Sequence, residues 1–146
     1  MPSRRLLLFT KPAIPGRVKT RLVGALSAEE AAELHAAFLG DLTERLSLGA
    51  FDLRLSWALE EEEVVPEGVS GQVIAGEPQI GGDLGERLYR GLEAAARDAE
   101  LVAAVGSDHP ELTLELVEEA FARLEERRVV LGPARDGGYY LVGVRA

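Results

Sequence analysis

The feature that most constrains this chain is an unbroken apolar run at 101–105, which leads into Gly-Ser-Asp-His-Pro at 106–110. Five apolar residues in a row, several of them small or β-branched, predict a strand covered on both faces. Gly106 and Pro110 mark the end of that strand. Because ligands of open α/β sheets bind beyond the carboxyl ends of the strands, Asp108 is expected to hold a divalent metal on a phosphorylated substrate.

Predicted strands and helices alternate along the rest of the chain, with short connections. The expected strands are 4–9, 51–59, 72–75, 101–105, 129–131 and 139–144. Helices are expected after the N-cap residues Ser27, Asp83 and Thr113, and a short helical turn is expected within 18–26. This alternation predicts a single domain, 1–146, with a mainly parallel sheet covered by helices on both faces.

The helix after Ser27 begins with a capping box, in which Glu30 stands three residues beyond the N-cap. Its apolar residues recur at helical spacing and are expected to pack on the sheet: Ala31, Leu34, Phe38, Leu42 and Leu46. His35 lies in the same helix, and we expect it to be a packing or surface residue rather than a ligand.

The composition of the chain excludes several classes of function. A chain of 146 residues that is 47% hydrophobic can bury the core of one globular domain. The absence of cysteine excludes disulfides and thiolate metal sites, and the net charge of −9 argues against binding a nucleic-acid polymer. The apolar run 6–9 is too short for a signal peptide or a membrane span, so we expect a cytoplasmic protein without membrane contact.

The positive charge is concentrated near the start of the chain. Residues 1–28 contain no Asp or Glu and six bases, so this segment carries +6 and the remaining 118 residues carry −15. A basic patch on an acidic body is suited to a small anion, although these bases could instead pair with surface carboxylates.

The loop after the first strand holds four of these bases: Lys11, Arg17, Lys19 and Arg21. It is not a Walker A motif, because Val18 stands where that motif needs the glycine before its lysine. A Pro/Gly loop with lysine and arginine side chains is nevertheless suited to a pyrophosphate or triphosphate, with Lys19 as a point charge and the arginines as planar donors. Arg21 could also pair with an acid on a helix.

A second motif, 79–87, reads Gln-Ile-Gly-Gly-Asp-Leu-Gly-Glu-Arg. Its glycines allow the backbone to approach a ligand closely, and Asp83 can begin a helix. The spacing does not match the G-x-G-x-x-G fingerprint, so a capped helix with a flexible lead-in remains the alternative. The candidate ligand contacts in this stretch are Gln79, Gly82, Asp83, Gly85 and Arg87.

Two further candidates follow. Ser107, Asp108 and His109 are consecutive, so they cannot converge as a hydrolase triad. In 132–143, Asp136-Gly137-Gly138 indicates either a ligand passing close to the main chain or a plain hairpin turn. Tyr139 and the tyrosine after it should face opposite sides of the last strand.

Taken together, four stretches resemble a bacterial family of GT-A-like proteins with the nucleotide-diphospho-sugar transferase fold, which includes proteins assigned as arsenosugar-biosynthesis glycosyltransferases. The matching stretches are 9–12 with 15–22, 79–87, 106–110 and 132–143, in family order. The resemblance implies a three-layer α/β/α Rossmann-like domain, a nucleotide sugar or nucleoside triphosphate as substrate, and Mg²⁺ or Mn²⁺ as cofactor.

The resemblance also assigns roles. Asp108 would take the place of the metal-binding acid and act with Lys19 in catalysis. The loop 11–21 would lie against phosphates and 79–85 near the base, with Ser107, Asp136, Gly137, Gly138 and Tyr139 as further substrate contacts. Family members usually continue beyond the last strand, so the fold is expected to be C-terminally shortened, with the acceptor-binding part missing or reduced. A homodimer would cover any apolar face left open. Glycosyl transfer, nucleotidyl transfer and a non-catalytic nucleotide-binding scaffold all remain open.

Overall fold

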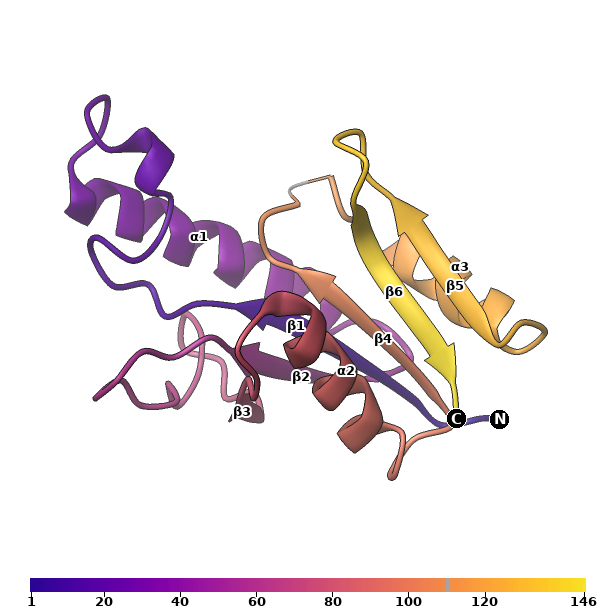
Figure 1. The fold of residues 1–146 in the computed structure, drawn as a ribbon. Helices are drawn as coiled ribbons and strands as arrows, with labels where there is room; N and C mark the ends of the chain where they lie inside the picture. Colours follow the sequence, from indigo (N-terminus) through magenta and orange to yellow (C-terminus); the bar gives the residue numbers. More distant parts are fainter. Residues whose placement is uncertain (110) are drawn as a thin grey trace.

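A six-stranded sheet forms the centre of the protein (Figure 1). The computed structural model describes residues 1–109 and 111–146, so Pro110 of the predicted 106–110 motif lies outside the described residues. The spatial order is β3-β2-β1-β4-β6-β5, where β1 to β4 run parallel and β6 runs antiparallel to β4 and β5. The strands are β1 (Arg4–Thr10), β2 (Asp52–Trp57), β3 (Gly76–Pro78), β4 (Leu101–Gly106), β5 (Val129–Pro133) and β6 (Tyr139–Arg145).

The helices begin at the predicted N-cap residues. They are α1 (Ala28–Leu46), α2 (Leu84–Ala95) and α3 (Leu114–Leu124), and a 3-10 helix, η1 (Thr20–Leu22), lies within the expected helical turn. The Ser27 hydroxyl and the Glu30 carboxylate each accept a bond from the other's backbone N–H, at 3.1 and 3.0 Å. Asp83 and Thr113 accept bonds from the N–H groups three residues on. Each such cap stabilises its helix by about 1 kcal/mol.

Helices cover both faces of the sheet, as predicted (Figure 1). On one face, α1 and α3 pack against β1, β2 and β4 through a core that includes Leu46, Trp57 and Phe121. On the other face, α2 packs Leu92 and Ala95 against β1 and β4. The residues 101–105 of β4 are at most 3% exposed, which confirms the prediction that this strand is covered on both sides.

Two predictions are wrong. The third strand is not 72–75, because Gly71 (φ +82°) and the backbone bonds between Val69 and Gln72 close a tight turn there. Pairing with β2 starts at Gly76, where the Trp57 ring leaves no room for a side chain. Phe38 is 44% exposed because His35 and Leu39 occupy the inner face of α1 instead.

The two ends of the parallel strands have different surroundings. The carboxyl ends of β1, β2 and β4 lie together on one side of the sheet, and residues 1 and 146 lie next to each other on the opposite side (Figure 1). There, Leu101 N–H donates to Ser3, and Ala146 N–H donates to Glu100. Among the described residues, no helix combines the length and the apolar character that a bilayer span needs.

The two phenylalanines provide a test of the core. Phe121 is fully buried, with its ring centroid 5.4 Å from that of Phe51, whereas Phe38 is largely exposed. In urea unfolding, Phe121→Ala should lower the free energy of unfolding by about 3–5 kcal/mol because it leaves a cavity. Phe38→Ala should cost about 1 kcal/mol or less. Similar losses in the two variants would contradict this packing.

Candidate active site

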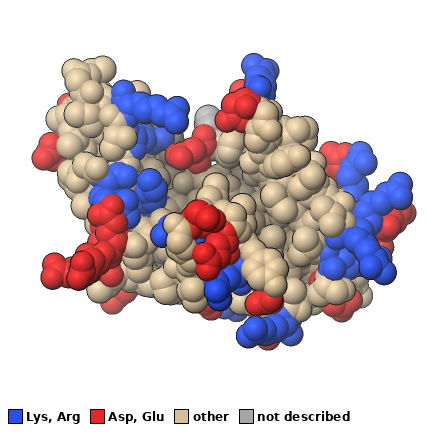
Figure 2. Space-filling model, viewed as in Figure 1, with Lys and Arg blue, Asp and Glu red and all other residues tan. Residues whose placement is uncertain are grey.

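A cavity of about 520 Å³ opens at the carboxyl ends of the parallel strands. Its walls are the end of β1 with the following loop, Ala58 after β2, the entrance to α2, and the segment 106–109 after β4. Figure 2 shows this face, with basic side chains gathered on the left of the hollow. The volume is typical of a site for a small molecule or cofactor.

Eight of the predicted site residues line this cavity: Lys11, Lys19, Gln79, Gly82, Asp83, Arg87, Ser107 and Asp108. They come from three stretches that are far apart in the sequence. The basic loop near the start of the chain and the mid-chain acid therefore meet at one cavity.

The other predicted residues do not line it. Arg17, Arg21 and Gly85 lie outside its lining, as do the turn residues Gly137 and Gly138 with Tyr139. Asp136 lines a neighbouring cavity beside His109, a residue that belongs to both linings. Direct ligand contacts by these residues stay predictions.

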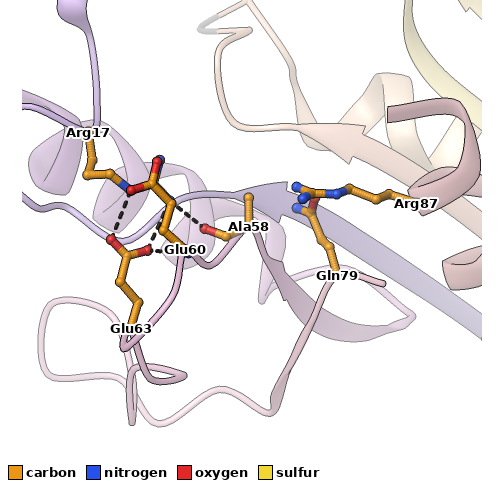
Figure 3. Close-up of polar contacts among 6 residues, drawn as sticks. All are labelled: Arg17, Ala58, Glu60, Glu63, Gln79 and Arg87. Carbon is orange, nitrogen blue, oxygen red and sulfur yellow. Dashed lines mark hydrogen bonds and ion pairs between the residues drawn. The ribbon is translucent and has the colours of Figure 1, made fainter. Parts of the chain in front are cut away.

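Arg17 forms a clamp with the loop after β2 (Figure 3). Its guanidinium donates two bonds to the Glu63 carboxylate, at 2.9 and 3.0 Å, and a third to the Ala58 carbonyl at 2.9 Å. A carboxylate oxygen of Glu60 lies 3.4 Å from a terminal nitrogen of the same guanidinium. The hydrogen bond raises the pKa of Arg17 and lowers the pKa of Glu63. Arg17 therefore follows the alternative given for these bases, because it pairs with carboxylates. It holds the basic loop in place and does not face the cavity.

Lys19 has an unusual backbone conformation, and its side chain contacts an aromatic ring. It adopts a left-handed conformation (φ 49°, ψ 40°) at the start of η1, which costs a non-glycine residue of order 1 kcal/mol. Its ammonium lies 4.9 Å from the centroid of the Phe38 ring. This cation–π contact restricts a side chain that would otherwise be mobile, and it gives the exposed Phe38 ring a partner on the outer face of α1.

A buried polar network connects the two halves of the cavity, and the sequence analysis missed it. The Ser107 hydroxyl donates to Thr10 Oγ1 at 2.9 Å, and His35 Nε2 lies 3.4 Å from that oxygen and 3.0 Å from the Lys11 carbonyl. Since a carbonyl can only accept, Nε2 carries the proton. Burial lowers the pKa of His35 below its ordinary value, although the hydrogen bond to the Lys11 carbonyl acts in the opposite direction, and the lowered pKa favours the neutral ring.

The entrance to α2 supplies a third cation. Arg87 donates from Nε to the Gly81 carbonyl at 3.0 Å and from a terminal nitrogen to Gln79 Oε1 at 3.3 Å (Figure 3). Within the described chain, no carboxylate lies at ion-pair distance from Arg87. Gly81 has φ +137°, which brings this turn back toward the helix. The arginine is thus positioned by neutral acceptors and keeps its charge available to an anion.

Asp108 fits a metal ion that takes most of its ligands from substrate and water. It is exposed, and residues 1–109 and 111–146 provide no ion-pair partner for it. The same residues hold no group of three acidic or histidine side chains arranged as a metal cage. Mg²⁺ commonly uses one or two carboxylates together with substrate phosphates. Asp83 lines the same cavity, but its side chain also caps α2.

Three structures show the class of fold. A crystal structure of a "putative nucleotide-diphospho-sugar transferase" from Desulfovibrio desulfuricans G20 matches with a TM-score of 0.90 and 34% identity, over 99% of this chain and 64% of that one. A 4-diphosphocytidyl-2C-methyl-D-erythritol synthase from Anaerococcus prevotii DSM 20548 matches with a TM-score of 0.62 and 14% identity, over 99% and 71%. A structure of CMP:2-keto-3-deoxy-manno-octonic acid synthetase complexed with CTP matches with a TM-score of 0.55 and 10% identity, over 98% of this chain and 74% of that one.

These matches show the nucleotide-diphospho-sugar transferase fold predicted from the motifs, with a mixed, mostly parallel sheet. The comparison with curated proteins gave no match. The family model described as "Uncharacterized protein conserved in bacteria (DUF2064)" matches residues 42–146, and the chain belongs to this family. The chain spans 64% of the length of its Desulfovibrio relative.

The Arg17 clamp predicts a pH-dependent contribution to stability. Because the pKa of Glu63 is lowered in the folded protein, the clamp stabilises the fold above the ordinary glutamate pKa of 4.5. This contribution is lost as the pH falls through the lower, folded value. In urea titrations, Glu63→Gln should therefore lower the free energy of unfolding at pH 7, and the difference from the unsubstituted protein should shrink in acid.

Glu61→Gln is the matched control, since Glu61 is exposed in the same acidic run. It should change stability little at either pH. A loss as large as that of Glu63→Gln, or a Glu63→Gln effect that is independent of pH, would contradict the clamp.

Proposed function

We propose that this protein is a nucleotide-using transferase, most simply a metal-dependent glycosyltransferase that takes a nucleotide sugar. One observation carries the proposal: Lys11, Lys19 and Arg87 face the same cavity as Asp108, at the carboxyl ends of the strands. Cations of this kind neutralise a diphosphate, and a carboxylate beside them suits a divalent metal on the same phosphates.

Each wall of the cavity has a distinct task in this proposal. Lys19 and Lys11 bind the phosphates from the side of the basic loop, and Arg87 binds them from the entrance to α2. Gln79 and Gly82 lie against the base. The network of Thr10 and His35 holds the Lys11 backbone in place, so the cations are positioned before the substrate arrives.

Mg²⁺ or Mn²⁺, held by Asp108, would supply further neutralisation of phosphate charge. In glycosyl transfer, an acceptor oxygen forms a bond to the anomeric carbon, the bond from that carbon to the phosphate oxygen breaks, and the nucleoside diphosphate leaves. The acceptor hydroxyl proton passes to solvent. Lys11, Lys19 and Arg87 stabilise the negative charge that develops on the leaving phosphate.

Nucleotidyl transfer is the second candidate, because two of the matched structures are a diphosphocytidyl-methylerythritol synthase and a CMP-sugar-acid synthetase. In that reaction the acceptor oxygen bonds to the α-phosphorus of a nucleoside triphosphate, the bond from that phosphorus to the oxygen that bridges to the β-phosphate breaks, and pyrophosphate leaves. The acceptor hydroxyl proton passes to solvent. The same cations would stabilise the leaving group. A non-catalytic scaffold that binds the nucleotide is the third candidate, and it differs from both in having no acceptor.

We also propose where in the cell the protein acts. Nucleotide sugars and nucleoside triphosphates are made in the cytoplasm, which is where we place the protein. A homodimer stays a prediction, and so does the absence of membrane and nucleic-acid partners.

Thermal shift tests the donor site. Nucleoside triphosphates and nucleotide sugars, each with and without Mg²⁺ or Mn²⁺, should raise Tm, and one class should do so most strongly in the presence of metal. Asp108→Asn should remove the metal-dependent part and leave metal-free binding unchanged or tighter, because it removes a charge that repels phosphate. Lys19→Gln should weaken binding about tenfold, since it deletes a charged hydrogen bond.

Asp98→Asn is the matched control, because Asp98 lies outside this cavity. It should bind as the unsubstituted protein does. Stabilisation that does not depend on metal would favour the scaffold, and the absence of any stabilisation by nucleotides would refute the proposal. Transfer of sugar or of nucleotide to an acceptor, followed by mass spectrometry, separates the two reactions.

A further inference from the structure

A second cavity, of about 450 Å³, adjoins the first. It lies between the start of α3 and the β5–β6 turn, and His109 belongs to the lining of both cavities. Asp108, the proposed metal ligand, is the residue before His109. A ligand in the second cavity would therefore lie beside the phosphates of a nucleotide in the first.

The wall formed by β5 and β6 is held in shape by close packing. A Cβ at Gly132 would stand 2.6 Å from the Tyr140 ring, so only glycine lets that ring lie across the strand. The register shifts between Gly132 and Pro133, as in a β-bulge. The Tyr140 ring lines the cavity, with its centroid 6.3 Å from that of His109.

The β5–β6 turn fixes a carboxylate in this wall. Ala134 N–H donates to the Gly138 carbonyl at 2.8 Å, and Gly137 adopts φ +93°. Asp136 Oδ1 accepts from Gly138 N–H at 3.0 Å, which orients the side chain, and Asp136 lines the cavity. Its second oxygen has no hydrogen-bond partner among the described residues.

The two cavities differ in charge. The first carries three cations, Lys11, Lys19 and Arg87, against the two acids Asp83 and Asp108. The second carries Glu111 and Asp136 against a single arginine, and the rest of its lining is apolar or aromatic apart from His109. A phosphate would be repelled by these acids, whereas the hydroxyl groups of a neutral ring can donate to them and its faces can pack on Tyr140.

We propose that the second cavity is the acceptor subsite and that it takes an uncharged, hydroxyl-bearing ring compound, such as a sugar or an aryl glycoside. This inference rests on the proposed transferase function and assigns the acceptor class. The ring packs on Tyr140, and a hydroxyl donates to Asp136. In this assignment the start of α3 and the last two strands supply the walls that contact the acceptor.

Ligand-detected saturation-transfer NMR on the full chain tests this assignment. The probes are phenyl β-D-glucopyranoside and methyl β-D-glucopyranoside, with glucose 6-phosphate as the charged counterpart. We expect saturation transfer to both neutral glycosides and little to the phosphate. Tyr140→Leu and Asp136→Asn should each reduce the transfer at least fivefold. Tyr89→Leu, a change to an exposed tyrosine on α2, should leave it unaltered.

The readings separate this inference from the proposed function. Nucleotide binding is measured on the same variants by thermal shift, which also shows that they are folded, and it should be retained. If nucleotides bind but neither glycoside does, if both variants bind the glycosides normally, or if glucose 6-phosphate binds better at the site defined by these variants, the acceptor assignment is overturned. If nucleotides do not bind, the donor proposal fails instead.

Discussion

The burial of β4 between two helical layers is the interaction on which the rest of the structure depends. Its apolar side chains contact the core of α1 and α3 on one side and that of α2 on the other, which fixes the strand at the centre of the sheet. The loop that follows must then leave the sheet at its carboxyl edge. His109 therefore lies in the lining of both cavities, and Asp108 lies in the lining of the first together with Gly106, the last residue of β4.

Local signals were sufficient for most of the fold. Three N-cap side chains and an apolar run defined the helices and the central strand, because capping and burial act within a few residues. The edge strand β3 was misplaced, since its three residues carry no apolar alternation, and the close approach of Gly76 to the Trp57 ring is a contact between distant residues. Phe38 was misassigned because its contact with Lys19 is made across a loop.

The site was predictable in part. Its charged residues were visible because cations without neighbouring acids are unusual in so acidic a chain. The partner of Arg17 was not visible, since Glu63 is distant from it in sequence and is one of four consecutive glutamates. Thr10 and His35 were missed for a related reason: their importance comes from a network that forms only when α1 meets the end of β1.

The reversal of direction at β6 has a topological consequence. Because this strand runs against β4, the chain finishes at the edge where β1 begins, and both termini are anchored next to each other by the main chain around Glu100 and Leu101. A segment joined to residue 1 or to residue 146 would therefore extend from the side of the sheet opposite both cavities, and it would leave the walls of each cavity intact.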